Sequence, residues 1–446
     1  MLQSIRERLA LVLIAFLPFH ALLVTLGTKL IEGPNHAPME ALAIWKEGVL
    51  GVLLVIAVVE IVSGQRTANS EQRTAFTIDA IDVLILALFA IALALFASGL
   101  PASLHDFLLG FRYDFVPLVA LVVFRRVPWT DRFLSTAYKV LFWDGVIVAA
   151  YGLITIALPM SFFTRLGYSD LHSIYLPDAP VAAFQQIGGI ALRRLQSTMS
   201  GPNQLGLWLL LPLTIALLRK ARPAFMLIAV VLFATVSRDA VLAMGVIVAA
   251  ILWKRTTHRK FFRMVAAALA IAFVIALAGI RFAPSIFLRP GSTIDHIARP
   301  LESLRLIVLH PLGMGLSAAG PASNHLHETC VFLRKGDDPS WASDRPELCV
   351  FVGGKQVQPV DHECDCPVLP ENWYVQIGVE LGVAGLILYL LLIGAILRKL
   401  TKGTAVVFLV FLAVSVAALF LHAWEDAALA YTLWMLVAVT LKRENV

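Results

Sequence analysis

The chain has 446 residues, of which 59% are hydrophobic and only 15% are charged, and its mean hydropathy is +0.81. This composition excludes a soluble globular domain, and continuous apolar runs of near twenty residues indicate helices that cross a membrane. The net charge of +6 is explained by basic residues between those runs and requires no nucleic-acid partner.

Taken in chain order, the apolar runs predict an all-α integral membrane protein with about twelve transmembrane helices in one polytopic domain, residues 1–446. The expected spans are 9–28, 44–63, 79–98, 107–124, 140–159, 203–218, 223–237, 239–253, 264–280, 373–396, 404–421 and 424–441. Basic residues precede the first run as in a signal peptide, but no clean cleavage site follows it, so we expect it to remain as the first helix. Two long polar segments, 160–202 and 282–372, separate the spans, and the second is expected to carry short helices.

Basic residues predict the orientation, because Lys and Arg gather in short cytoplasmic loops. If the amino terminus lies in the cytoplasm and the spans alternate, more than half of the Lys and Arg fall in inward segments. These include "SGQRTANSEQRTA", "RRVPWTDRF", "RKARP", "KRTTHRKFFR", "RKLTKG" and "LKRENV". Both termini are therefore expected in the cytoplasm, and both long polar segments on the outer side.

The chain has four cysteines, all in the second long segment: Cys330, Cys349, Cys364 and Cys366. An oxidising outer side favours two disulfides, each contributing about 2–4 kcal/mol to stability. Three pairings are possible, and the sequence does not choose among them. Zinc bound by His362, Cys364 and Cys366 is the alternative, which the even cysteine count disfavours.

Basic residues at the outer side or at membrane depth depart from the orientation pattern. They include Lys46, Arg112, Arg165, Arg193, Arg194, Arg238, Arg299 and Arg305. Each could pair locally, Arg112 with Asp114 and Arg238 with Asp239, or lie against lipid headgroups. Several arginines at one outer face favour a phosphate site, because guanidinium groups bind phosphate oxygens through two parallel hydrogen bonds. We therefore expect an outer cavity for a lipid pyrophosphate or, in a transporter, for an anionic solute.

Several motifs follow one another in a fixed order. They are "WKE" at 45–47, "GFRY" at 110–113, "RLQSTMSGPNQLG" at 194–206, "VSRD" at 236–239, "ARPLESLRLIVLHPLGMGLSAAG" at 298–320 and "ENWYVQIGVELGVAGL" at 371–386. In this order they resemble the O-antigen ligase and polymerase family of bacterial membrane glycosyltransferases. The resemblance covers nearly the whole chain and rests on the ordered set rather than on any single motif.

The resemblance implies a C-type glycosyltransferase-like architecture in the bacterial inner membrane, with the active site at the periplasmic face. The donor would be a glycan on undecaprenyl pyrophosphate, and the acceptor a hydroxyl of lipid A core or the end of another lipid-linked glycan. No cofactor and no metal ion are expected, and membrane lipids are the other partners. An O-antigen or exopolysaccharide polymerase would share the donor and differ in the acceptor. A secondary transporter or lipid-glycan flippase is the alternative from another class, although no internal repeat of the transporter kind is evident.

The chemistry of such a transfer assigns roles to charged residues. Pyrophosphate leaves the anomeric carbon with growing negative charge, which needs cations nearby. The candidates are Arg194, Arg238, Arg112 and Arg299. The attacking hydroxyl needs a base, which contributes about 10²–10⁴ to the rate. One attacking group and one leaving group, with no covalent enzyme intermediate, predict inversion at the anomeric carbon.

The identity of the base is open between two places in the sequence. Many family members have His before Asn at the start of the last motif, whereas this chain has Glu371 before Asn372. His325 and His327 follow the "PLGMG" stretch closely and also fit the family's histidine. We favour Glu371 slightly, although an acid at a helix start is also favourable by itself, by about 0.3–1 kcal/mol.

Two further features are expected around this site. An amphipathic helix within 299–308 would carry Leu301, Leu304 and Val308 on one face, as suits a membrane surface. Trp373 and Tyr374 are expected at the membrane interface. Supporting roles in the site are expected for Lys46, Asn203, Asn372 and Tyr374.

Overall fold

The computed structural model describes residues 1–67, 78–169, 180–187, 193–282, 290–333 and 335–443, which are mostly helical. The helices up to the first long polar segment are α1 (Leu2–Phe16), η1 (Leu17–Phe19), α2 (His20–Glu32), α3 (Glu40–Ala43), α4 (Trp45–Thr67), α5 (Ala80–Ala97), α6 (Leu104–Asp114), α7 (Val116–Phe124), α8 (Asp131–Ala157) and α9 (Met160–Arg165). Those after it are α10 (Pro202–Trp208), α11 (Leu210–Leu218), α12 (Arg222–Ala234), α13 (Arg238–Arg255), α14 (His258–Phe282), α16 (Pro290–Leu309), α17 (Gly320–Leu326), η2 (Ser340–Ala342), α18 (Trp373–Leu400), α19 (Ala405–Ala417) and α20 (Ala427–Arg443). The strands are β1 (Gln185–Gln186), β2 (Arg193–Arg194), β3 (Cys330–Leu333), β4 (Cys349–Val352) and β5 (Lys355–Gln358).

Four helical runs in the described part of the chain are long and apolar enough to cross a membrane. They are Leu2–Glu32, which joins α1, η1 and α2, and the helices α5, α8 and α18. α6 and α7 make a fifth if the bend of 55° between them lies within one span. These runs support a membrane protein, but the prediction of about twelve spans is not supported.

Several of the predicted spans form helices that are too short to cross a membrane singly. Residues 203–218 are divided between α10, with 7 residues, and α11, with 9. The span expected at 223–237 corresponds to α12, which has 13 residues and ends at Ala234. At 1.5 Å per residue such a helix is about 20 Å long, well short of a typical hydrocarbon core. Hydropathy identified these apolar runs but not the breaks inside them.

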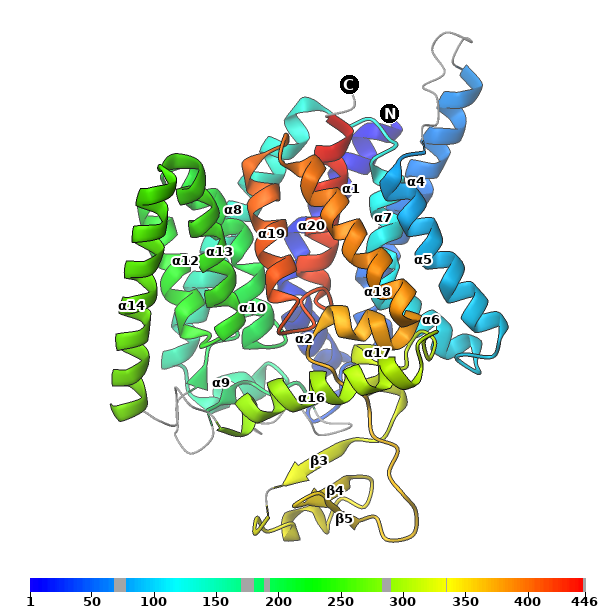
Figure 1. The fold of residues 1–446 in the computed structure, drawn as a ribbon, viewed down its shortest axis with the longest axis vertical. Helices are drawn as coiled ribbons and strands as arrows, with labels where there is room; N and C mark the ends of the chain where they lie inside the picture. The colour runs from blue at the N-terminus through cyan, green and yellow to red at the C-terminus, as the bar shows by residue number, and fades with distance from the viewer. Residues whose placement is uncertain (68–77, 170–179, 188–192, 283–289, 334, 444–446) are drawn as a thin grey trace.

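The two ends of the helix bundle differ in what they carry. Both termini lie at one end, whereas α9 and α16 lie at the other, with β3–β5 beyond α16 (Figure 1). Between the ends, α11, α19 and α20 form much of the buried core. Phe411, Trp424 and Trp434 pack there with ring centroids 5.2 to 5.4 Å apart. The described parts of both long polar segments therefore share the end opposite the termini.

α18 contains a break that its sequence explains. Gly382 has φ 71° and ψ −173°, a backbone conformation open almost only to glycine. The loop after α16 binds at this break. Met314 donates its N–H to Val379 O at 2.9 Å, and the next residue donates to Glu380 O at 3.0 Å. The "PLGMG" and "VELG" stretches are therefore two halves of one contact, which joins the end of α16 to α18.

α16 is amphipathic, and the predicted helix within 299–308 is part of it. Leu301, Leu304 and Val308 are exposed, whereas Ser303 and Ile307 are buried. The predicted amphipathic helix is therefore present, with these three apolar residues exposed, and its place at a membrane surface stays a prediction. The opposite face packs on α18.

The second long polar segment contains a small lobe on a three-stranded sheet, which we call the disulfide lobe (residues 328–366). β3 pairs with β4 in parallel, and β4 pairs with β5 antiparallel. Two disulfides close the lobe, and they join Cys330 to Cys366 and Cys349 to Cys364. The prediction of two disulfides is confirmed.

The strands of this lobe correct the expectation of an entirely α-helical chain. Gly353 and Gly354 both have positive φ, 58° and 82°, as a tight hairpin turn requires. They separate "CVFV" from "KQVQ", which form β4 and β5. This Gly-Gly pair between two β-prone stretches was the available signal, and an analysis based on long apolar runs passes over it.

Candidate functional site

Charged side chains at the α16 end of the bundle gather around Glu371, which lies just before α18. Its Oε1 accepts a hydrogen bond from Arg299 Nη1 at 2.8 Å. Its Oε2 lies 2.5 Å from His296 Nδ1. The Glu371 side chain is 20% exposed, and those of His296 and Arg299 are 34% exposed. The ion pairs are therefore partly buried but still accessible from the protein surface.

These charges shift one another's protonation. Burial acts to raise the pKa of Glu371, but the hydrogen bond to His296 and the positive charges of His296 and Arg299 outweigh burial and hold this pKa below its ordinary value. The hydrogen bond to Glu371 raises the pKa of His296, against the opposing effect of burial. At neutral pH Glu371 is ionised, and His296 is protonated to a greater extent than an isolated histidine.

The backbone of Glu371 is held by His422, in the turn between α19 and α20. Glu371 has φ 50°, in the left-handed region that non-glycine residues seldom adopt. Its N–H donates to His422 Nε2 at 3.1 Å, and His422 Nδ1 lies 2.8 Å from Gln376 Oε1. Burial lowers the pKa of His422 to about 4, so the ring is neutral and Nε2 can accept this bond. Asn372 then caps α18, because its Oδ1 accepts the N–H of Val375 at 3.0 Å.

Arg194 and Arg238 belong to the same electrostatic environment. Asp239, in the first turn of α13, lies within electrostatic reach of both arginines. It also interacts with the charges of His296 and Glu371. The structure therefore brings together three of the four predicted donor-binding arginines. We call the following set the Glu371 cluster: Arg194, Arg238, Asp239, His296, Arg299 and Glu371.

Arg194 is fixed by neutral oxygen atoms. Its Nε donates to Thr235 O at 3.0 Å, and its Nη1 donates to Gln185 Oε1 at 2.8 Å. Its Nη2 donates to Asn203 Oδ1 at 2.7 Å. Asn203 lies in the first turn of α10, so the spacing from Arg194 to Asn203 in the third motif brings the two side chains into contact. Asn203 therefore holds the Arg194 side chain in place, and its supporting role in a donor site stays a prediction.

Lys46 and Arg112 lie in a second group, around Glu47. Arg112 binds Glu47 Oε1 through Nη2 at 2.6 Å and Nε at 2.8 Å, while Lys46 Nζ lies 3.4 Å from Glu47 Oε2. Tyr431 donates to Oε1 at 3.4 Å. Arg112 therefore pairs with Glu47. Local pairing would have joined it to Asp114 instead. Among the described residues, Lys46 and Arg112 form their ion pairs with Glu47, so we assign them to this second group and not to the Glu371 cluster.

Of the two candidate histidines, His325 lies near this second group. The His325 ring stacks on Tyr113, with centroids 6.3 Å apart and an interplanar angle of 13°. Burial lowers the pKa of His325, and the positive charge of Arg112 acts in the same direction. His327 directly follows α17, and its Nδ1 lies 2.9 Å from Ser323 O. Of the three predicted bases, the glutamate is the one held by the cations of the Glu371 cluster.

Trp373 and Tyr374, expected at the membrane interface, are packed against other helices, and their depth in the membrane stays a prediction. They are 1% and 6% exposed. Trp373 Nε1 donates to Tyr389 OH at 3.0 Å, and Tyr374 OH donates to Ser415 O at 2.6 Å. Both rings are packed inside the bundle, where they fix the first turn of α18 and so support the position of Glu371.

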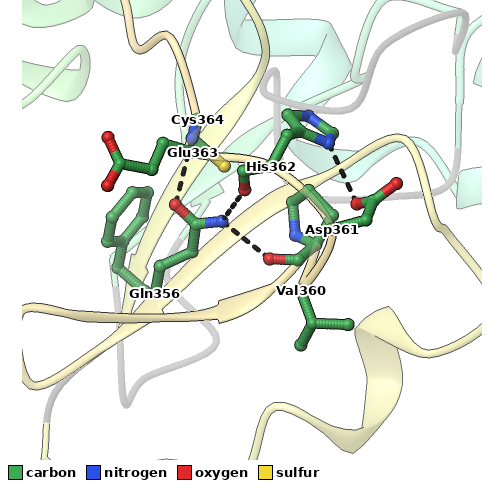
Figure 2. A pocket seen from close by; sticks show the side chains of 8 residues that line it. Gln356, Val360, Asp361, His362, Glu363 and Cys364 are labelled. Carbon is green, nitrogen blue, oxygen red and sulfur yellow. Dashed lines mark hydrogen bonds and ion pairs between the residues drawn. The ribbon is translucent and has the colours of Figure 1, made fainter.

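Hydrogen bonds of Gln356 shape a pocket on the disulfide lobe (Figure 2). Gln356 Nε2 donates to the carbonyl oxygens of Pro359 and His362 at 2.6 and 2.7 Å. Its Oε1 accepts the N–H of Cys364 at 3.0 Å. These bonds fold the chain around Gln356. The zinc alternative is wrong, because the sulfurs of Cys364 and Cys366 are each bonded to another sulfur.

Two residues of the site, His296 and His422, were not predicted from the sequence. His296 lies three residues before Arg299, a spacing that places two side chains on one helix face, so the sequence did contain a signal for it. His422 lies in a turn far along the chain from Glu371, and no local pattern distinguishes it. No family model matches this chain, and a comparison with curated proteins found no match. The functional conclusion therefore depends on the residues of the site and on the order of the motifs.

Proposed function

We propose that this chain is a membrane glycosyltransferase that moves a glycan from undecaprenyl pyrophosphate to a hydroxyl of lipid A core, at the periplasmic face of the bacterial inner membrane. One observation carries the proposal: His296 and Arg299 bind an ionised, partly exposed carboxylate, and Asp239 links this carboxylate electrostatically to Arg194 and Arg238. Cations gathered in this way suit a diphosphate leaving group, and an ionised carboxylate is the form that can accept a proton.

The proposed reaction is a single displacement. Glu371 accepts the proton of the attacking hydroxyl while the oxygen of that hydroxyl bonds to the anomeric carbon. The bond from this carbon to the diphosphate oxygen breaks, and the electron pair leaves with the diphosphate. Arg194, Arg238 and Arg299 stabilise the charge that develops there. Attack and departure take place on opposite sides of the carbon, so the mechanism inverts its configuration, and the arginines supply the positive charge that a metal ion would otherwise provide.

In this proposal both termini lie in the cytoplasm. The basic segments between the apolar runs support that orientation. The disulfide lobe and α16 lie at the end of the bundle opposite the termini, where an oxidising compartment would keep the disulfides intact (Figure 1). A donor in the outer leaflet would then present its diphosphate to the Glu371 cluster.

A second candidate, a secondary transporter or lipid-glycan flippase, is favoured by one buried contact. The carboxyl groups of Asp114 and Glu380 meet inside the bundle, where Asp114 also accepts a hydrogen bond from Gln376 Nε2 at 3.1 Å. Paired acids at membrane depth are typical of ion-coupled transport. The same Gln376 binds His422, which holds Glu371, so the pair also serves to position the proposed base.

The test uses purified full-length protein in nanodiscs and a glycan on undecaprenyl pyrophosphate, with and without lipid A core. Glycan transferred to lipid A core identifies a ligase, and longer lipid-linked chains formed without that acceptor identify an O-antigen or exopolysaccharide polymerase. Glu371→Gln should abolish transfer, whereas the His325→Ala, His327→Ala double variant should retain it. Movement of intact donor from one leaflet to the other in proteoliposomes, without cleavage of the bond between glycan and diphosphate, would support the flippase. Absence of transfer by folded protein with a verified donor would refute the glycosyltransferase.

A further inference from the structure

The Glu371 carboxylate engages two of the cations that a diphosphate would need. Oε1 is bound by Arg299 at 2.8 Å, and Oε2 lies 2.5 Å from His296. A phosphate group placed between a guanidinium and an imidazolium would use two of its oxygens in the same way. The carboxylate therefore stands in the place of one phosphate group.

A carboxylate held in this way is a poor base. Both of its oxygens are engaged, and its cationic neighbours, acting against burial, hold its pKa below the ordinary value. A general base works best with a pKa near the working pH and a lone pair directed at the substrate hydroxyl. The arrangement in the structure therefore corresponds to a resting state of the proposed enzyme.

The main chain at Glu371 is anchored independently of its side chain. His422 accepts the backbone N–H at 3.1 Å. The next residue, Asn372, caps α18 and donates its Nδ2 to Leu419 O at 2.8 Å. The carboxylate can thus leave its cations by rotation of its own side chain, without movement of α18.

We propose that Glu371 is an internal anion that the donor's diphosphate displaces, and that this displacement releases the carboxylate to act as the base. Arg299 and His296 pass to diphosphate oxygens, and the freed carboxylate turns to the acceptor hydroxyl. The identity of the displacing anion rests on the proposed function. The consequence is that the base becomes available only when the donor is bound.

Binding of inorganic pyrophosphate to the full-length protein in nanodiscs tests the inference without requiring transfer. Glu371→Gln removes the internal anion and should bind pyrophosphate about tenfold more tightly than wild type, because the ligand no longer competes with a charged hydrogen-bond acceptor. Glu302→Gln is the matched control, since Glu302 is an exposed acid on α16, the helix that carries His296 and Arg299, and its loss changes the net charge equally. It should alter the affinity by less than about twofold.

Glu371→Asp guards against misfolding of the Gln variant, because it keeps the charge on a side chain too short to engage both cations fully. It should also bind pyrophosphate more tightly than wild type. Affinity in both Glu371 variants equal to or below that of wild type overturns the inference, as does full transfer by Glu371→Gln. Wild-type protein that transfers glycan without a gain of affinity in the variants leaves the proposed function intact and removes only the displacement. Wild-type protein that neither binds pyrophosphate nor transfers glycan removes both.

Discussion

Alanine at Gly382 should destabilise the protein, whereas alanine at Gly394, further along α18, should not. Gly382 has φ 71° and ψ −173°, which costs a non-glycine residue about 1–3 kcal/mol. Its Cβ would lie 2.4 Å from Pro311 O, so the loop after α16 must move and its three backbone hydrogen bonds to α18 weaken, each contributing about 0.5–1.5 kcal/mol. The expected loss is about 2.5–7.5 kcal/mol in total. A Cβ on Gly394 meets nothing within 4 Å, and alanine there should be neutral or stabilising by up to about 1 kcal/mol.

The two variants are compared by thermal unfolding of detergent-solubilised protein and by glycan transfer. Gly382→Ala should unfold at a lower temperature and lose transfer, because the cations of α16 are no longer held in register with Glu371. Gly394→Ala should keep both the unfolding temperature and the activity. Equal unfolding temperatures for the two variants would refute the reasoning that the loop after α16 holds the break in α18.

Three further predictions concern the site and the lobe. Arg194→Lys should lower transfer about 10- to 100-fold in folded protein, because lysine cannot reproduce the separate hydrogen bonds of the guanidinium; a twofold change in the transfer assay would contradict this. The His296–Glu371 ion pair should stabilise the protein most between about pH 4.5 and 6.5. The raised pKa of His296 gives a contribution to stability that is complete below pH 6.5 and is lost as the pH rises through the pKa of His296 in the folded state. The lowered pKa of Glu371 gives a contribution that is complete above pH 4.5 and is lost as the pH falls through the pKa of Glu371 in the folded state. The difference in unfolding temperature between wild type and His296→Gln should peak in that window, and a difference independent of pH would argue against the pair. Reduction of both disulfides should destabilise the lobe by about 2–4 kcal/mol per bridge; limited proteolysis should then cut the lobe first, and cuts spread through the bundle would show that the lobe is not a separate unit.

The charged residues of the site could be found from the sequence, but their grouping could not. Arginines that violate the positive-inside pattern are visible in the sequence, and so is the acid at the start of the last motif. Arg112 and Arg299 are equally unusual by that criterion. Their partners, Glu47 and Glu371, lie 65 and 72 residues away, and only tertiary packing distinguishes the two pairs.

The fold divides in a similar way between what the sequence could predict and what it could not. Apolar runs and the amphipathic character of α16 follow from hydropathy, which is a local property of the chain. The break at Gly382 requires knowledge of the loop that fills it, and the strands of the disulfide lobe are too short for periodicity to reveal. The burial of Trp373 and Tyr374 depends on partners in α18 and α19, which residue type alone does not reveal.

The contact between the loop after α16 and α18 also imposes an order on biogenesis. The carbonyl groups of Val379 and Glu380 bind that loop at the break in the helix. A carbonyl without a partner is strongly unfavourable in lipid, so α18 cannot take its final bent form when it first enters the membrane. In the proposed orientation, it must wait until the preceding outer segment has been exported and has folded back onto it. Maturation of a protein with that orientation is therefore paced by the folding of a segment outside the membrane, after the helix that depends on it has already been inserted.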